Sequence, residues 1–155
     1  MWSISVHLAT YTRNNGKPDQ LSSCAIQLNG ACPEGTATRT ISQFLGNKNQ
    51  SQSEIYCALA AITAIIPIKT KIELYSNSAP LIRLLTKKDG LWGTTNKNLA
   101  MVTKLREAID KRAQIIVSHD SASDSIKTVI DLAKSTLHTK VGTDTGTNLN
   151  NAKTQ

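Results

Sequence analysis

Residues 51–77 read SQSEIYCALAAITAIIPIKTKIELYSN, and their pattern of apolar residues changes partway along. Residues 51–66 are rich in alanine and apolar on most faces, which is typical of a helix buried against a sheet. Residues 69–77 instead alternate, with Ile72 and Leu74 on one face, and predict a strand. A buried helix followed directly by a strand indicates a sheet that is covered by helices.

The ends of this predicted helix carry local signals. We expect Ser51 or Ser53 to cap its N-terminus, because a serine hydroxyl can accept a hydrogen bond from a free backbone N–H there. Glu54 would then lie in the first turn, where its negative charge is favourable to the helix dipole. We expect Pro67 to end the helix, since proline lacks the N–H that a helix interior requires.

The residues before this helix predict three strands. Residues 2–12 alternate between apolar and polar side chains, and residues 22–28 and 36–45 form two further extended stretches. The segments 14–20 (NNGKPDQ) and 29–35 (NGACPEG) have the composition of turns. Three consecutive strands with short connections favour an antiparallel meander.

The residues after this unit predict further helices and one more strand. In order, we expect a short helix over 78–87, a loop over 87–97, an amphipathic helix over 98–113, a strand over 114–119 and a last helix that starts at Ser121 or Ser123. Strands that alternate with helices pair in parallel. The sequence therefore predicts an α/β fold with a mixed five-stranded sheet, in which three antiparallel strands are followed by parallel strands and helices flank the sheet.

The predicted elements form one domain over residues 1–137. The remaining residues, 138–155, have almost nothing to bury and predict a disordered C-terminal tail. No apolar run approaches the roughly 20 residues of a membrane helix, and the N-terminus lacks the basic and apolar regions of a signal peptide. We therefore expect an intracellular protein, cytoplasmic or nuclear, that is neither secreted nor embedded in a membrane.

Charge and cysteine content narrow the chemistry. The chain of 155 residues has 18 Lys and Arg against 11 Asp and Glu, and this net charge of +7 points to an acidic partner such as nucleic acid. Cys24, Cys32 and Cys57 form no Cys-x-x-Cys pair, so we expect buried free thiols rather than a disulfide framework or a zinc site. A Cys–His nucleophilic pair stays open as an alternative, although no local motif supports it.

Several segments, taken in order, resemble the type 1 ribonuclease H domain of the ribonuclease H superfamily. SQSEIYCALAAI (51–62) resembles the family's helix that begins with a catalytic Glu, and IELYSNSAPLI (72–82) resembles its fourth strand and the short helix after it. IIVSHD (115–120) with IDLAK (130–134) resembles its last strand, mobile His and final helix. GLWGTTNKN (90–98) resembles its Trp-bearing basic segment. The resemblance covers nearly all of the predicted domain.

This resemblance implies a nuclease that cleaves the RNA strand of a DNA–RNA hybrid with two divalent metal ions, Mg²⁺ or Mn²⁺, held by four carboxylates. Glu54 matches the carboxylate on the first helix and Asp131 the one on the last helix, while Asn77 falls where the fourth strand should supply an Asp. His119 matches the mobile His. The first-strand Asp should lie within residues 8–13 (LATYTR), which contain no acidic residue. We therefore expect a degenerate site that holds no metal or, if any, one at Glu54 and Asp131.

The matching positions also have purely structural interpretations. Asn77 suits a turn at a strand end, and His119 suits a hydrogen-bonded position at the end of a strand. Asp131 can pair with a lysine of its own helix, either Lys127 or Lys134. These interpretations require no ligand.

Most of the positive charge lies in one stretch. Residues 83–112 hold eight basic and three acidic residues, and they include the segment that resembles the substrate-gripping element of the family. We expect this stretch to contact the phosphates of nucleic acid. The candidate binding residues are Lys87, Lys88, Trp92, Lys97 and Lys104. The tryptophan either stacks on a nucleotide or packs under its own loop.

Three functions fit the sequence. The first, which we predict, is a catalytically degenerate ribonuclease H-like domain that binds a nucleic acid duplex or DNA–RNA hybrid through a basic face and needs no cofactor. The second is an active ribonuclease H that depends on Mg²⁺ or Mn²⁺ and has a rebuilt site, in which Asp120 or Asp124 replaces a lost ligand. The third is a non-enzymatic scaffold of a virus or mobile element that forms a homo-oligomer or binds a protein partner.

Overall fold

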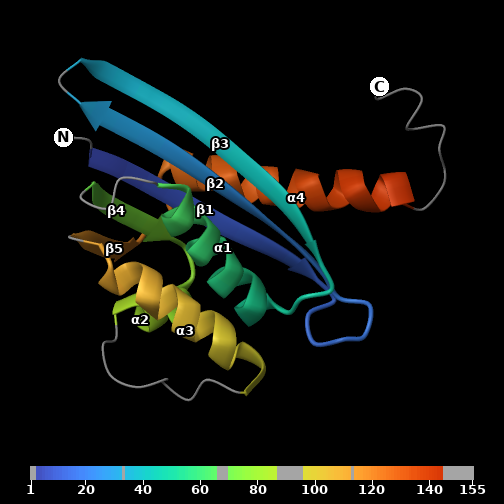
Figure 1. Cartoon of the computed structure of the whole chain (residues 1–155). Coiled ribbons are helices and arrows are strands. Elements are labelled where there is room, and N and C mark those ends of the chain that lie inside the picture. The colour runs from blue at the N-terminus through green and yellow to red at the C-terminus, as the bar shows by residue number, and fades with distance from the viewer. Residues whose placement is uncertain (1–2, 33, 66–69, 87–95, 113, 145–155) are drawn as a thin grey trace.

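The computed structural model describes residues 3–32, 34–65, 70–86, 96–112 and 114–144 (Figure 1). Its elements are, in chain order, β1 (Ser3–Arg13), β2 (Leu21–Cys32), β3 (Gly35–Gly46), α1 (Gln50–Ala64), β4 (Lys71–Ser76), α2 (Ala79–Thr86), α3 (Asn96–Asp110), β5 (Ile115–His119) and α4 (Asp124–Asp144). The predicted order of strands and helices is confirmed.

The strands form one mixed five-stranded sheet in the order β3-β2-β1-β4-β5. β1 pairs antiparallel with β2, and β2 pairs antiparallel with β3. β1 pairs in parallel with β4, and β4 pairs in parallel with β5. The predicted α/β architecture is therefore confirmed, and β1 lies at its centre because it joins the antiparallel half to the parallel half.

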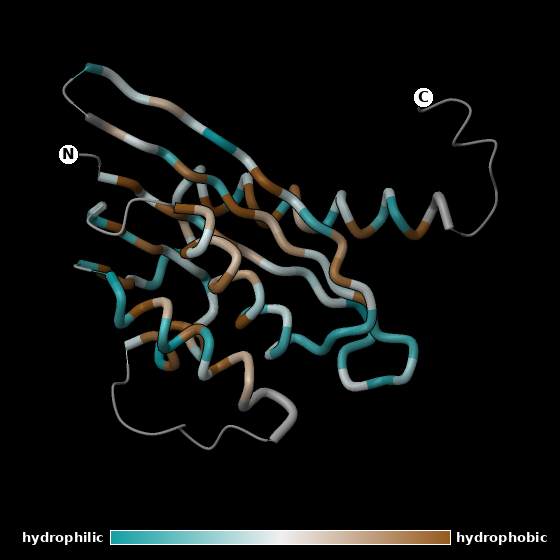
Figure 2. Tube along the Cα trace, in the orientation of Figure 1, coloured by the Kyte–Doolittle hydropathy of each residue, from teal (hydrophilic) through white to brown (hydrophobic). Residues whose placement is uncertain are grey.

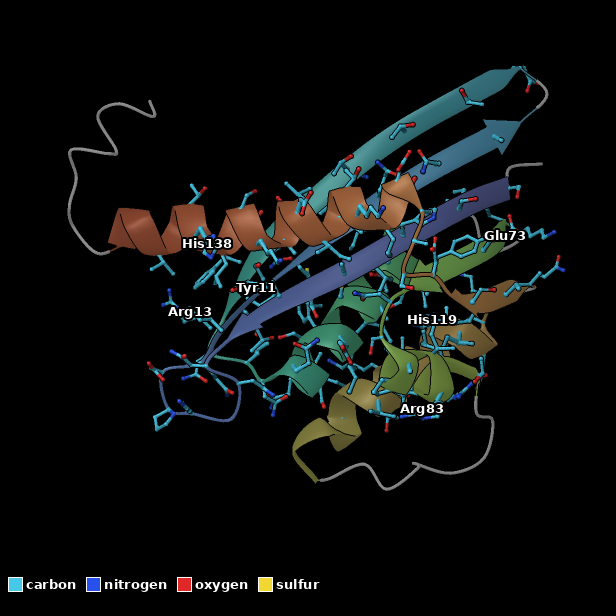
Figure 3. All side chains as sticks on the ribbon, turned by 180° about the vertical axis from the view of Figure 1, so that it is seen from behind. Tyr11, Arg13, Glu73, Arg83, His119 and His138 are labelled. Carbon is cyan, nitrogen blue, oxygen red and sulfur yellow. The ribbon has the colours of Figure 1, made fainter. Side chains whose placement is uncertain are left out.

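β1 sends alternate side chains to opposite faces of this sheet. Val6 and Leu8 are fully buried in a core that α1, α2 and α3 cover, whereas Ala9 and Tyr11 pack against α4. Figures 1 and 3 show the two layers from opposite sides. In Figure 2 the hydrophobic residues lie along the strands and helices, and the turn after β1 is hydrophilic. The sheet is therefore the middle layer of three.

The cap of α1 differs from the prediction. It is Asn49, not Ser51 or Ser53: the Asn49 side chain accepts the backbone N–H of Gln52 (2.8 Å), and the Gln52 side chain accepts that of Asn49 (3.0 Å). This reciprocal capping box satisfies two free N–H groups at once, which explains why the helix begins after Asn49 rather than after Ser51 or Ser53. The first turn of α1 contains no acidic residue. The predicted place of Glu54 in that turn is therefore wrong.

Pairing with β3 extends β2 into the predicted turn at residues 29–35. Asn29 lies opposite Thr38, and Cys32 lies opposite Gly35. Most of this segment is therefore strand, because ladder pairing overrides its turn-like composition.

α4 is longer than predicted. It starts after the predicted cap Ser123 and continues through residues 138–144, so the predicted disordered tail is wrong for those residues. In this part of the helix, His138 contacts the ring of Tyr11 on β1, and Nζ of Lys140 lies 5.9 Å from the centroid of the Phe44 ring on β3. The rest of the predicted tail, residues 145–155, lies outside the described residues. Even with this added length, none of the described helices is long and apolar enough to cross a membrane.

Candidate functional site

A buried carboxylate lies where α1 meets the C-terminal half of β1. Glu54 is only 8% exposed, and its Oε2 accepts a hydrogen bond from Nε2 of Gln50 at 2.7 Å. The same Nε2 donates to Oγ1 of Thr10 on β1 at 3.0 Å. The amide nitrogen of Gln50 carries two N–H groups, so it can donate one hydrogen bond to the Thr10 hydroxyl and one to the Glu54 carboxylate.

Local structure holds this network in place. Gln50 and Glu54 are four residues apart on α1, so their side chains lie on one side of the helix. The backbone N–H of Gln50 donates to Oδ1 of Asn15 at 2.9 Å, which ties the start of α1 to the turn after β1. Thr10 faces α1 because it lies on the same side of β1 as the buried Leu8.

Asn77 lies where β4 has just ended, and its side chain is exposed. Its neighbours are occupied with the turn into α2. The hydroxyl of the buried Ser76 accepts the N–H of Ser78 at 3.1 Å, and the Ser78 hydroxyl accepts the N–H of Leu81 at 3.2 Å. The turn interpretation of Asn77 accounts for these surroundings.

Asp131 is exposed on α4, across the sheet from α1. Its neighbours Ile130 and Leu132 pack against the core beneath α4. Within the described residues, Arg106 forms an ion pair with Asp110, and Asp120 lies close to His7, which is charged only when protonated. The pairing of Asp131 with a lysine of its own helix is therefore not seen.

The family positions do not supply the donors that two divalent metal ions need. In the part of the chain that the structure describes, no group of three His, Cys, Asp or Glu side chains is placed to hold a metal ion. The polar neighbours of Glu54 are an amide N–H donor and, beyond it, a hydroxyl. The residues present do not fit the two metals that the resemblance implies.

His119 ends β5 and is exposed, and the next residue organises the turn into α4. Oδ1 of Asp120 accepts the backbone N–H groups of Ala122 (3.0 Å) and Ser123 (3.1 Å). Hydrogen bonds from the Ser123 hydroxyl and from these two N–H groups lower the pKa of Asp120 to about 2. Asp120 therefore has a structural role in this turn.

A polar cluster beside Asp120 was missed by the sequence reasoning. His7 on β1 stacks on Tyr75 of β4 with ring centroids 4.8 Å apart, and its Nε2 lies 3.8 Å from Oδ2 of Asp120. Burial lowers the pKa of His7, and the charge of Asp120 opposes this shift only in part. The alternation of β1 was the available signal, because it places His7 on the face opposite Val6 and Leu8.

The predicted nucleic-acid-binding residues are described only in part. Lys104 is exposed on α3, and Lys97 belongs to the same helix, although its side chain lies outside the described residues. Lys87, Lys88 and Trp92 also lie outside them. The prediction for these four side chains therefore stays a prediction.

The end of the basic stretch has a structural role. Nη2 of Arg112 donates to the backbone carbonyl oxygen of Ile62 at 2.8 Å and to that of Ile65. These carbonyls belong to the last turn of α1, where a cation is favourable to the helix dipole. Arg112 thus helps to hold α3 against α1.

Two of the three cysteines are core residues, as predicted. Cys24 and Cys57 are buried free thiols, and the side chain of Cys32 lies outside the described residues. A hydrogen bond with Cys24, together with burial, raises the pKa of the Cys57 thiol. A thiol held in its protonated form is a poor nucleophile.

Comparison with known proteins shows similarity in structure but not in sequence. The chain matches no protein-family model, and no curated protein matches it significantly. The N-terminal ribonuclease H domain of Rv2228c from Mycobacterium tuberculosis superposes with a TM-score of 0.74 at 10% identity, over 93% of this chain and 99% of that chain. RNase H1 from Halobacterium salinarum superposes with a TM-score of 0.66 at 19% identity, over 88% of this chain and 98% of that chain.

A viral protein has the same fold in one part of its chain. The foamy viral protease–reverse transcriptase, solved in complex with an RNA/DNA hybrid, superposes with a TM-score of 0.66 at 15% identity. The match covers 85% of this chain and 19% of that chain. The superpositions show that this chain has the fold of type 1 ribonuclease H domains. At sequence identities this low, the similarity establishes the fold alone.

Proposed function

We propose that this chain is a ribonuclease H-like domain that binds a nucleic acid duplex, such as a DNA–RNA hybrid, and does not cleave it. The observation that carries the proposal is the Gln50 amide, which is hydrogen-bonded to both Thr10 and Glu54. Glu54 matches the catalytic Glu of the family's first helix, and one of its carboxylate oxygens already accepts a hydrogen bond from the neutral Gln50 side chain.

The chemistry of metal-assisted cleavage explains why this matters. Two divalent ions that activate water and stabilise the leaving oxygen require anionic oxygen ligands from several elements. An amide N–H carries partial positive charge and cannot ligate a cation. β1 contributes only the hydroxyl of Thr10 here, and the residue after β4 is the uncharged Asn77. We infer that the domain works without a metal cofactor.

Charge and fold support the binding part of the proposal. The chain carries a net charge of +7, and a structure of the same fold is in complex with an RNA/DNA hybrid. Lys104 presents an exposed ammonium group on α3. We assign Lys87, Lys88, Trp92 and Lys97 to the same binding face, and we propose that the domain acts inside the cell.

A fluorescently labelled DNA–RNA hybrid tests binding and cleavage in one system. We expect fluorescence anisotropy to show binding that weakens steeply as salt rises, because bound phosphates release counterions. Lys104→Glu should weaken binding roughly tenfold by losing one phosphate contact and adding repulsion. Arg39→Glu reverses a charge at an exposed position of β3, away from α3, and should change the affinity much less.

Incubation of the same hybrid with Mg²⁺ or Mn²⁺ should leave it intact, even at high protein concentration. Cleavage that disappears in Glu54→Gln would overturn the non-catalytic part and establish the enzyme alternative. Binding that is undetectable or independent of salt would overturn the binding part. A stable oligomer in size-exclusion chromatography that ignores the hybrid would then favour the scaffold alternative.

A further inference from the structure

Aromatic and basic side chains meet at the C-terminal end of β1, on the face that α4 covers. The ring of Tyr11 meets the ring of His138 edge to face, with centroids 5.7 Å apart and an interplanar angle of 80°. Nζ of Lys134 lies 5.9 Å from the centroid of the Tyr11 ring. Figure 3 shows Tyr11, Arg13 and His138 together at this end of the sheet. Two elements far apart in sequence therefore build one surface, which we call the α4-side surface.

Further positive charge adjoins this surface. Lys127 lies seven residues before Lys134, so both project from the same side of α4, and both are exposed. Arg13 lies on the same face of β1 as Tyr11, and its side chain is partly exposed. Its guanidinium carries a permanent positive charge and several N–H groups that can donate to a phosphate.

Two acidic residues of α4 oppose this charge. Asp124 lies three residues before Lys127, and Asp131 lies between the two lysines; both are exposed, and neither forms an ion pair within the described residues. The local sum of the three cations and these two carboxylates is still positive. Asp131 should therefore repel a phosphate that the three cations attract.

The stretch that forms this surface is the one in which the sequence lacks a carboxylate. By the resemblance, residues 8–13 should hold the acidic residue of the first strand. They contain no acidic residue, and they include Tyr11 and Arg13. A metal ion in a nuclease neutralises the charge of a bound phosphate. Fixed cations of the protein can neutralise the same charge without a metal.

We propose that the α4-side surface, formed by Arg13, Lys127 and Lys134 beside Tyr11 and His138, binds backbone phosphates of a nucleic acid duplex directly and without metal ions. This inference rests on the proposed function and adds a second contact surface to it, across the sheet from α3. Phosphate contacts on both α3 and α4 would hold the duplex at two points.

The full chain and a fluorescein-labelled DNA–RNA hybrid, titrated in EDTA at several salt concentrations, test this proposal. The double variant Lys127→Gln/Lys134→Gln should bind roughly tenfold more weakly, and the slope of log affinity against log salt should fall by about 1 to 2. Arg39→Gln, the matched control on β3, should bind within about twofold of the wild type. Replacing EDTA with Mg²⁺ should not tighten binding.

The variant Asp131→Asn distinguishes direct phosphate binding by the α4-side surface from binding through a metal ion held by Asp131. Removal of a repulsive charge should tighten binding roughly two- to fivefold, whereas loss of a metal ligand would weaken it in Mg²⁺. The proposal is overturned if the double lysine variant behaves like Arg39→Gln while Lys104→Glu still weakens binding; the proposed function would then stand. It is overturned together with the proposed function if the wild-type chain shows no salt-dependent binding.

Discussion

The two faces of the sheet are built in different ways. On one face, α1, α2 and α3 enclose a continuous apolar core whose buried strand residues come from β1, β2 and β4, while β3 and β5 add partly buried side chains. On the other, α4 packs on β1, β2 and β3 over a small core. The buried members of that small core are Ala9, Ala25, Ile126, Val129 and Ala133. The large apolar core of the first face stabilises the fold. The smaller core of the second face leaves room for polar and charged groups such as His7 and Arg13.

Truncation of one isoleucine on each face should give the largest effect. Ile72 on β4 and Ile126 on α4 are both fully buried, with 0% of their surface exposed. Ile→Ala in a core costs about 2–5 kcal/mol of unfolding free energy, depending on how far the surroundings collapse into the cavity. We expect Ile72→Ala near the upper end, because a sheet and helices enclose it, and Ile126→Ala near the lower end, because α4 can shift onto the sheet. Urea denaturation followed by circular dichroism measures both.

Ile116 provides the control of the same residue type. It lies on β5 and is 43% exposed, so Ile116→Ala should change the unfolding free energy by no more than about 0.5 kcal/mol. Equal losses for Ile72→Ala and Ile126→Ala would contradict the difference between the faces.

Acid should act on the α4 side through His7 and Asp120, with a smaller effect. Both groups have a pKa that is lower in the folded state, so each contributes stability above its unfolded pKa and loses it as the pH falls. For His7 this loss begins below about pH 6.5, and for Asp120 it extends from about pH 4 to about pH 2. Asp120→Asn can still accept hydrogen bonds from the turn but has no charge to lose.

Thermal unfolding of wild type and Asp120→Asn across this pH range checks the assignment. The wild type should be the more stable at neutral pH, and the difference in Tm should shrink as the pH falls below about 4. A difference that stays constant down to about pH 2 would show that the charge of Asp120 contributes nothing.

The contact between Lys134 and Tyr11 should have the smallest effect. An exposed cation over an aromatic ring contributes about 0.5–1 kcal/mol, and the 5.9 Å separation here lies near the outer limit of such contacts. We expect a double-mutant cycle of Lys134→Met and Tyr11→Leu to give a coupling energy of about 0.5 kcal/mol. A coupling energy of zero would mean that Lys134 points freely into solvent and that only its charge matters to the α4-side surface.

Periodicity in the sequence was sufficient to predict the architecture. The alternation along residues 2–12 and the alanine-rich stretch at 51–66 indicate which side chains are buried, because apolar residues recur with the spacing of a strand in the first and of a helix in the second. The ends of the helices were harder to predict, because they depend on the residues that each helix contacts in the folded chain. Asn49 caps α1 through reciprocal hydrogen bonds with Gln52, and the added length of α4 includes His138, which contacts the Tyr11 ring of a strand far away in sequence.

The candidate site was predictable only as a set of positions. The resemblance placed Glu54 and Asp131 on helices and Asn77 at the end of a strand; the structure has Glu54 on α1 and Asp131 on α4, while Asn77 directly follows β4. The Gln50 amide that joins Glu54 to Thr10 could not be predicted, because that contact depends on the pairing of a strand and a helix about 40 residues apart in sequence. The stack of His7 on Tyr75 depends in the same way on the register of β1 against β4.

The alternation of β1 also separates two kinds of evolutionary change. Its even-numbered residues, such as Leu8 and Thr10, serve the core and the Glu54 network, while its odd-numbered residues, such as His7 and Tyr11, face the other way. A substitution at an odd position leaves the packing of the even positions intact, because each strand residue contacts one face only. The central strand can therefore exchange one ligand chemistry for another, one residue at a time, without disturbing the packing of the core that defines the fold.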